Sequence, residues 1–206
     1  MTDEYKTIDP DTLDPRDAYR LNISLLVPRP IAWVTSIGPD GVFNCAPFSF
    51  FMGVSSSPPV IAFAVGDRRT GPKDTARHIE AHPEFTVNIC SEALGSKMVQ
   101  SSADYPTGVS EFSEVGLTPV PSEVVKPPRI GGAPVQMECK LHHLFKVEDT
   151  STTMILGRVV RYHIKNSVLD DKGELVDIRR LKPLGRLGGI QYCRINDIIE
   201  LERREI

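Results

Sequence analysis

Apolar and polar positions alternate through much of this 206-residue chain, which predicts strands more often than helices. In residues 31–37, Ile-Ala-Trp-Val-Thr-Ser-Ile, every second side chain points to the same side, as in a strand between two different surroundings. The same period returns in residues 85–89 and 135–142, and residues 154–164 follow as a long return strand. Residues 60–65 are apolar throughout, which is typical of a central strand covered on both faces.

Turn residues separate these strands and predict one bend. Gly38-Pro39-Asp40-Gly41 predicts a turn, because proline presets φ and glycine tolerates positive φ. Residues 43–45 begin a second strand, which we expect Ala46-Pro47 to interrupt. Proline cannot donate to a sheet, so this segment belongs at an edge, a bulge or a bend. Residues 55–59 are expected to form a loop, and residues 190–195 a brief last strand.

Helical patterns are short and few. Asp14-Pro15 predicts a helix start, so that residues 1–24 form a leader with a helical arm. Asp74 or Thr75 would cap a helix that ends at His82-Pro83. Ser91 would cap another helix, which runs to about residue 103.

An irregular excursion follows over about residues 104–134. It holds six prolines, and only residues 109–115 predict a helical piece. A long irregular segment within a compact domain is often functional or forms an interface.

The pattern as a whole predicts a mainly β domain. Six or so strands, mostly joined by hairpins and accompanied by few helices, indicate a closed antiparallel barrel with helices at its ends. A doubly wound sheet would need strands and helices in regular alternation, which this chain lacks. No repeat or linker divides the chain, so we expect residues 1–206 to form a single domain.

Composition excludes several classes of protein. The net charge is −3, the isoelectric point is about 6.0 and the basic residues are scattered, which argues against a nucleic-acid partner. No segment approaches the roughly 20 apolar residues of a transmembrane helix, and the acidic N-terminus is unlike a secretory signal. The four cysteines lie far apart, so we expect reduced thiols, no metal site and a cytoplasmic protein.

One segment has the composition of an anion site. In residues 71–75, Gly-Pro-Lys-Asp-Thr, a lysine stands just ahead of a predicted helix start, where free N–H groups and the helix dipole favour phosphate. Alternatively, Lys73 is a solvated charge and Asp74 an ordinary N-cap. No catalytic dyad, nucleophile elbow or nucleotide loop stands out. This suits an activity in which a bound cofactor performs the chemistry.

Taken together, four segments resemble the flavin reductase-like family, in its flavoredoxin-type branch of FMN-binding split barrels. They are RPIAWVTS followed by DGVFNCAPFSFF; GPKDTARHI followed by EFTVNI; SEFSEVGLTP followed by VQMECKL; and GRVV followed by RLGGIQY. They occur in the family's order and span roughly residues 26–192. The resemblance implies a six-stranded antiparallel Greek-key split barrel that forms a homodimer and holds FMN near the subunit interface.

The resemblance also implies the residues that bind FMN. Those expected at the phosphate or the ribityl chain are Thr35, Ser36, Lys73, Asp74 and Thr75. Those expected along the edge of the isoalloxazine ring are Asn44, Ala46, Pro47, Phe48 and Ser49. Further members of the wall are expected to be Arg29, Gly188 and Tyr192.

The activity that the resemblance implies is that of a flavoprotein oxidoreductase. Hydride or electrons would move between NAD(P)H, bound FMN and an acceptor, which is free flavin, another small molecule or a protein partner. Short-chain flavin reductases carry Gly-Asp-His ahead of the strand glycine, whereas Thr150-Ser151-Thr152 precedes Gly157 here. An FMN-binding electron carrier without direct NAD(P)H turnover therefore stays open, as does a barrel that takes another ligand, such as haem.

Overall fold

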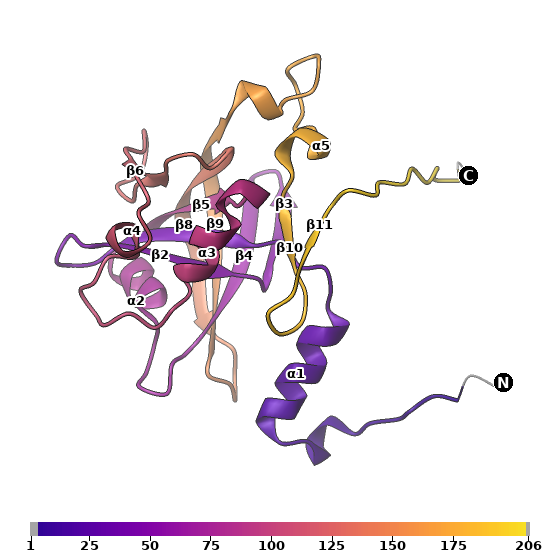
Figure 1. The fold of residues 1–206 in the computed structure, drawn as a ribbon. Helices are drawn as coiled ribbons and strands as arrows, with labels where there is room; N and C mark the ends of the chain where they lie inside the picture. Colours follow the sequence, from indigo (N-terminus) through magenta and orange to yellow (C-terminus); the bar gives the residue numbers. More distant parts are fainter. Residues whose placement is uncertain (1–3, 205–206) are drawn as a thin grey trace.

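A curled antiparallel sheet of seven strands forms the body of the computed structural model, which describes residues 4–204 (Figure 1). The order of its strands is β2-β1-β5-β8-β9-β4-β3. The strands are β1 (Ala32–Ile37), β2 (Phe43–Phe48), β3 (Phe51–Ser56), β4 (Pro59–Gly66), β5 (Glu84–Ile89), β8 (Val135–Lys146) and β9 (Thr152–Ile164). Two smaller sheets pair β6 (Pro119–Val120) with β7 (Arg129–Ile130), and β10 (Leu184–Arg186) with β11 (Tyr192–Arg194).

The predicted mainly β class and antiparallel barrel are confirmed, but the predicted count of six strands is one short. Strand β3 was not predicted, and residues 55–59 were expected to form a loop. All residues of β3 except Phe51 are exposed, so its pattern has no buried face to reveal a strand. The short strand β10 was missed as well, because three residues are too few to show a period.

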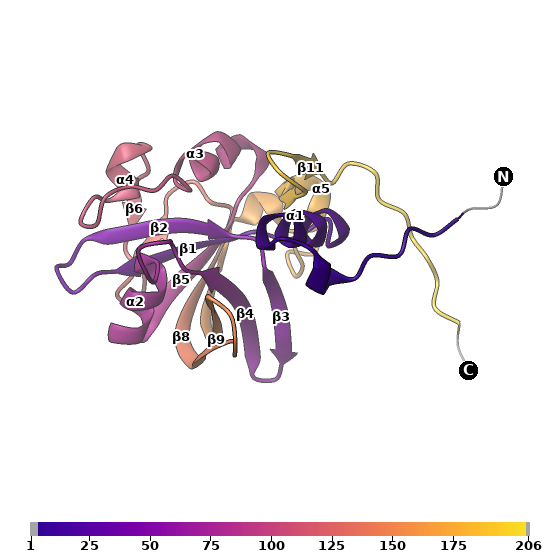
Figure 2. The ribbon, with the colours of Figure 1, turned by 90° about the horizontal axis from the view of Figure 1, so that it is seen from below.

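The sheet closes on itself where β2 meets β4. The ring centroids of Phe48 on β2 and Phe63 on β4 lie 5.4 Å apart. Figure 2 shows β1 and β2 running across the direction of β3 and β4, so the chain turns a sharp corner at residues 49–50. This corner turns one continuous sheet into a barrel.

Short helices cover the ends and one outer face of this barrel. They are η1 (Pro10–Thr12), α1 (Pro15–Leu25), α2 (Asp74–Ala81), η2 (Glu92–Leu94), α3 (Gly95–Gln100), α4 (Glu111–Glu114), η3 (Asn166–Val168) and α5 (Ile178–Leu181). The helix predicted after Asp14 is confirmed as α1, and the Asp14 side chain caps it. Of the predicted arm, residues 1–3 lie outside the described residues. No helix among residues 4–204 is long and apolar enough to cross a membrane.

Two predicted helix starts were wrong in detail. Helix α2 begins at residue 74, but Lys73 occupies its N-cap, so neither Asp74 nor Thr75 caps it. The helix predicted from Ser91 to residue 103 is broken into η2 and the short α3, with Ser91 making no capping hydrogen bond. The hydroxyl groups of Ser101 and Ser102 bind the carbonyls of the last turn, and such side-chain bonds compete with helix continuation.

Two apolar cores lie on opposite faces of β1. Val34 belongs to the barrel interior, where it packs in one cluster with Phe85. Trp33 belongs to a second cluster beneath α3 and α4, together with Met98 and Phe112. The two different surroundings that the alternation predicted for this strand are therefore confirmed.

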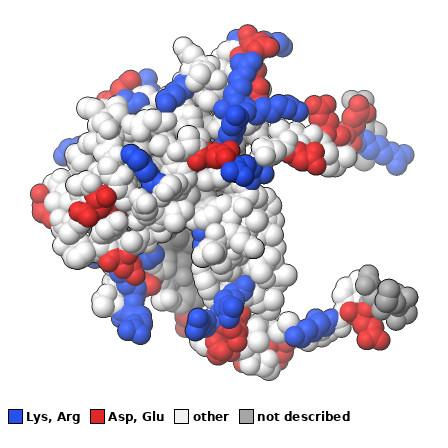
Figure 3. All heavy atoms as spheres, viewed as in Figure 1, with Lys and Arg blue, Asp and Glu red and all other residues white. Residues whose placement is uncertain are grey.

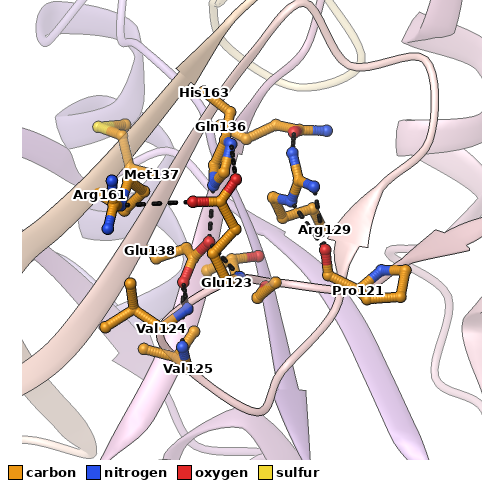
Figure 4. A network of polar contacts seen from close by, with 12 residues as sticks. Pro121, Glu123, Val124, Val125, Arg129, Gln136, Met137, Glu138, Arg161 and His163 are labelled. Carbon is orange, nitrogen blue, oxygen red and sulfur yellow. Dashed lines mark hydrogen bonds and ion pairs between the residues drawn. The ribbon is translucent and has the colours of Figure 1, made fainter.

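A fully buried carboxylate fastens the excursion to the barrel (Figure 4). Glu138 on β8 accepts hydrogen bonds from the backbone N–H groups of Glu123, Val124 and Val125, at 2.8, 2.6 and 3.0 Å. His163 on β9 lies on the same carboxylate. The excursion is thus irregular in backbone but held at a defined place, with α4 inside the predicted helical piece at residues 109–115.

Charged side chains of both signs are interspersed over the face seen in Figure 3, without a continuous basic field. The four cysteines are all free, and three of them are buried.

Candidate functional site

A groove runs along the outer edge of β2, which is an edge strand of the sheet. It consists of two compartments that share Pro47 and Ser102. The helix compartment lies at the start of α2, and the predicted residues that line it are Asn44, Ala46, Pro47, Lys73, Asp74 and Thr75. The corner compartment lies between α1, the corner after β2 and β11, and the predicted residues that line it are Arg29, Pro47, Ser49 and Tyr192.

On the outer edge of β2, side chains of the excursion, and not another strand, form hydrogen bonds with the backbone groups. Glu111 accepts a hydrogen bond from the N–H of Cys45 at 2.9 Å, and the hydroxyl of Ser110 donates to the carbonyl of Phe43 at 2.6 Å. Because outward-facing groups alternate along a strand, Pro47 falls at the next outward position, where a missing N–H breaks no ladder bond. The predicted edge position is therefore confirmed, but the predicted interruption of the strand is wrong.

The helix compartment contains unused donors from the first turn of α2. Lys73 at the N-cap makes no capping hydrogen bond, and within residues 4–204 the backbone N–H groups of Asp74 and Thr75 donate to no acceptor. Free N–H groups at the positive end of a helix favour an anion. The Nζ atom of Lys73 adds a full positive charge and lies 5.8 Å from the ring centroid of Phe48.

Arg68 brings a second cation to the helix compartment. Its Nη1 atom lies 3.3 Å from a carboxylate oxygen of Asp74, which also pairs with Arg77. Its Nε atom is buried and lies 3.2 Å from Asp104, yet it makes no hydrogen bond of good geometry. A buried guanidinium N–H without an acceptor is costly, and a phosphate oxygen would satisfy it. The donors present therefore fit a phosphate group.

Asn44 links β2 to the start of α2. Its amide donates to the hydroxyl of Thr75 at 2.9 Å and to the hydroxyl of Ser36 at 3.3 Å. Ser36 in turn lies 3.3 Å from Nδ1 of His78. Ser36 is itself fully buried beneath Asn44, so it supports the compartment from behind. Burial lowers the pKa of His78, so this ring is neutral near pH 7.

The corner compartment is organised by Arg29, whose guanidinium joins four segments of the chain. It donates to the carbonyls of Ile23 and Leu26 in and after α1, to the carbonyl of Leu187, and to the hydroxyl of Ser49 at 3.2 Å. Arg29 is only 7% exposed, and burial followed by the charge of Arg186 lowers its pKa. This arginine therefore fixes the corner on which Ser49 stands.

Arg186 and Tyr192 form the far wall of the corner compartment. The guanidinium carbon of Arg186 lies 4.5 Å from the centroid of the Tyr192 ring, a cation–π arrangement. Gly188 lies in the connection between β10 and β11, near the carbonyl of Ile23, behind this wall. It therefore shapes the wall without lining it.

Two predicted residues face away from the groove. Thr35 is fully buried on the other face of β1, where its hydroxyl bonds to Thr86 and to the carbonyl of Pro128. Phe48 packs against Phe63 in the barrel, and its ring lies beneath Lys73.

Six residues that line the helix compartment were not identified from the sequence: Arg68, Ser101, Ser102, Ala103, Asp104 and Glu111. Burial raises the pKa of Glu111, while the N–H of Cys45 opposes this effect. The net effect is that the pKa of Glu111 is higher than that of an ordinary glutamate. The basic cluster around Arg68 was a usable signal in the sequence, whereas the serines and Glu111 carried none, because they reach the groove only through the tertiary fold.

Comparison with known proteins shows which family and which structures this chain resembles. The model of the Flavin reductase like domain matches residues 24–184. The structure is similar to nitrilotriacetate monooxygenase component B from Bacillus cereus, with a TM-score of 0.92 and 32% identity over 97% of this chain and 100% of that one. It is also similar to 2-nitrobenzoate 2-nitroreductase from Pseudomonas fluorescens, with a TM-score of 0.88 and 32% identity over 97% and 96%. An NADH-dependent FAD reductase from Streptomyces globisporus is 35% identical over 114 residues, which are 53% of this chain and 57% of that protein.

Proposed function

Because the chain belongs to the flavin reductase-like family, we propose that its β2 groove binds FMN and that the protein is an NAD(P)H-dependent flavoprotein oxidoreductase. The observation that supports this most directly is the meeting of two segments in one groove. Lys73 at the start of α2 lines the helix compartment together with Ala46 and Pro47 of β2, and both compartments share Pro47. One phosphorylated ring system would contact both segments.

The phosphate would occupy the helix compartment. The free N–H groups of Asp74 and Thr75 and the ammonium of Lys73 supply donors for it, as does Nε of Arg68, which lies near Asp104 but makes no hydrogen bond within residues 4–204. The nearby carboxylate of Asp74 already pairs with two arginines, which reduces its repulsion of a phosphate. The ribityl chain would meet the hydroxyl of Thr75 and the serines that follow α3.

The ring would lie over Pro47 toward the corner. When bound, FMN supplies the capacity to accept a hydride and to pass on one or two electrons. The protein positions the ring edge with the hydroxyl of Ser49, which Arg29 holds at 3.2 Å. The apolar side chains of Ile31 and Met98 help to exclude water from the corner compartment. Glu111 lines the helix compartment at the edge of β2, and burial raises the pKa of its carboxyl group.

NAD(P)H is the proposed source of reducing equivalents, which agrees with the NADH-dependent reductase among the relatives. An electron carrier that does not oxidise NAD(P)H directly is the second candidate. It is favoured by the segment Thr150-Ser151-Thr152, where short-chain flavin reductases carry a histidine. In that case a protein partner would supply the electrons that reduce the bound FMN.

A homodimer in the cytoplasm is the proposed form of the protein. Apolar side chains are exposed on α1 and β3, beside the corner compartment, and would be covered by a second copy. The free cysteines are consistent with a reducing compartment.

Flavin titration tests this proposal. The purified protein is titrated with FMN and with FAD while visible absorbance and flavin fluorescence are followed, and NADH and NADPH oxidation are then measured with each flavin. We expect saturable FMN binding and nicotinamide oxidation. A protein that binds neither flavin contradicts the site, whereas flavin binding without oxidation of either nicotinamide selects the electron carrier.

A further inference from the structure

The helix compartment, where the phosphate of FMN is proposed to bind, is lined by acidic side chains as well as basic ones. The acidic residues are Asp74, Asp104 and Glu111. The Asp74 carboxylate pairs with Arg68 and Arg77, and the side chain of Asp104 is 80% exposed. Glu111 differs from both, because it is only 4% exposed and makes no ion pair within residues 4–204. Its charge is therefore the least screened of the three.

The Glu111 carboxyl group is held in place by the backbone of β2. Its Oε2 atom accepts a hydrogen bond from the N–H of Cys45 at 2.9 Å, and no side chain among residues 4–204 donates to either oxygen. Burial raises the pKa of this carboxyl group, which the N–H of Cys45 opposes. The charge of Asp74 raises the pKa further and that of Arg68 lowers it, so both charges lie close enough to act on Glu111. The thiol of Cys45 stays neutral, because burial followed by the charge of Glu111 raises its own pKa.

The helix compartment is too narrow to keep a phosphate away from Glu111. Its cavity volume is about 40 Å³. A cavity needs roughly 10–15 Å³ to hold one water, so this space has room for about three waters, and one phosphate group fills it. A phosphate that accepts from Lys73 and from the N–H groups of Asp74 and Thr75 would therefore also contact the other side chains that line this space, Glu111 among them.

A phosphate and an ionised Glu111 would repel each other strongly in this space. A phosphate monoester carries about 1.5 to 2 negative charges near pH 7. Like charges that share a partly buried site do not both stay ionised without a large cost, and a proton on one of them removes the repulsion. The protonated carboxyl group also gains an O–H donor, which can bond to the phosphate while Oε2 still accepts from Cys45.

We propose that Glu111 binds the phosphate of FMN as the neutral acid, so that one proton from solvent enters the site together with the flavin. This inference rests on the proposed function, because it requires the FMN phosphate to occupy the helix compartment. The pKa of Glu111 is then higher in the complex than in the free protein. FMN affinity is therefore greatest below the pKa of the free protein and is lost as the pH rises through the pKa of the complex.

Glu111→Gln tests the proposal, because an amide is a permanent stand-in for the neutral acid. Its oxygen can accept from the N–H of Cys45, and its amino group can donate to the phosphate. FMN dissociation constants of the unmodified protein and the variant are measured by flavin fluorescence between pH 5 and pH 9. Relative to the variant, the unmodified protein should lose about tenfold in affinity or more as the pH rises, since each unit of pKa shift on binding changes affinity tenfold. The ratio of the two constants cancels the ionisation of the phosphate itself.

Calorimetry counts the proton directly. The enthalpy of FMN binding is measured at one pH in two phosphate-free buffers that differ in ionisation enthalpy. We expect the unmodified protein to take up more protons per FMN than Glu111→Gln. Riboflavin, which lacks the phosphate, should bind both proteins with the same pH dependence. Glu114→Gln, at an exposed glutamate of α4, is the matched control and should behave as the unmodified protein.

A constant ratio of the FMN dissociation constants across this pH range, or equal proton uptake by the two proteins, overturns the proposal. A pH-dependent difference that riboflavin shows as well also overturns it, because Glu111 would then act without the phosphate. If Glu111→Gln does not fold, proton uptake by the unmodified protein is measured at pH 8 with FMN and with riboflavin. Uptake with FMN alone is then expected, and its absence overturns the proposal.

If the unmodified protein binds no flavin at any pH, the proposed function fails by itself. Inorganic phosphate then replaces FMN in the same calorimetric titrations of the flavin-free protein. Absence of phosphate binding, or binding with the same pH profile in the unmodified protein and Glu111→Gln, overturns the role of Glu111 too.

Discussion

The Nε2 atom of His163 lies 2.6 Å from Oε1 of Glu138, a carboxylate with no exposed surface (Figure 4). The imidazole and three consecutive backbone N–H groups of the excursion converge on this one side chain. Burial alone would raise the pKa of Glu138. The hydrogen bonds from Glu123, His163, Val124 and Val125 together outweigh that effect and hold the pKa below its usual value.

Glu138→Gln is therefore expected to destabilise the protein by about 2–4 kcal/mol, because an amide cannot accept all four donors and leaves some of them buried and unpaired. Chemical denaturation at pH 7 measures the loss. Glu80→Gln, at an exposed position on α2, is the control and should change stability by no more than about 0.5 kcal/mol.

The same carboxylate predicts how stability depends on pH. A carboxyl whose pKa is lowered by folding stabilises the native state fully above its unfolded-state pKa, near the ordinary 4.5, and this contribution is lost as the pH falls toward the folded-state pKa. Below about pH 4.5, the unmodified protein should lose stability more steeply than Glu138→Gln. Parallel curves for the two proteins between pH 3 and pH 5 would contradict this role.

Lys73→Ala should weaken FMN binding by roughly 1.5–3 kcal/mol, because it removes a charge-assisted bond to the phosphate. Riboflavin, which lacks the phosphate, should bind both proteins alike in the same titration. Lys172→Ala, in an exposed turn, is the matched control. Unchanged FMN affinity in Lys73→Ala would show that this lysine is only a solvated charge.

Gly157→Ala should destabilise the barrel by about 2–3 kcal/mol. A Cβ atom at Gly157 would lie 2.2 Å from Cζ of Phe85, a fully buried ring in the close-packed interior that has little room to move. Gly66→Ala, at the end of the neighbouring strand β4, meets nothing within 4 Å and should be close to neutral. Similar melting temperatures for the two variants would show that the Phe85 ring moves aside without cost.

Leu25→Glu should convert the proposed dimer to monomers and weaken FMN binding as well. Leu25 is 69% exposed on α1, beside the corner compartment, so a charge there costs the single subunit little but would be buried in the interface. Light scattering after size-exclusion chromatography gives the mass. Leu175→Glu, at a residue 71% exposed in a distant turn, should leave the mass unchanged. A monomeric unmodified protein would contradict the dimer directly.

Local pattern was sufficient to predict elements whose two faces differ. The alternation around Trp33 and Val34 identified β1 and its two surroundings, and Pro47 indicated an edge strand, because both properties depend on a few neighbouring residues. The cap of α2 was predicted one or two residues too late, at Asp74 or Thr75 and not at Lys73, because Asp and Thr are ordinary capping residues and lysine is not. Strand β3 was not predicted, because nearly all of its residues are exposed and no alternation of apolar and polar positions marks it.

The sequence by itself determined the strand pattern, the fold class and the order of the segments that indicate a flavin protein, all of which are encoded by neighbouring residues and their spacing. Only the tertiary structure decided which side chains share the groove. Arg29 meets the carbonyl of a residue 158 positions away, and Glu111 meets Cys45 across 66 positions. Thr35, adjacent to the supporting Ser36, points to the opposite face, because successive residues of a strand alternate sides. Closure of the barrel and the phase of each strand fix these contacts, and neither is a local property of the chain.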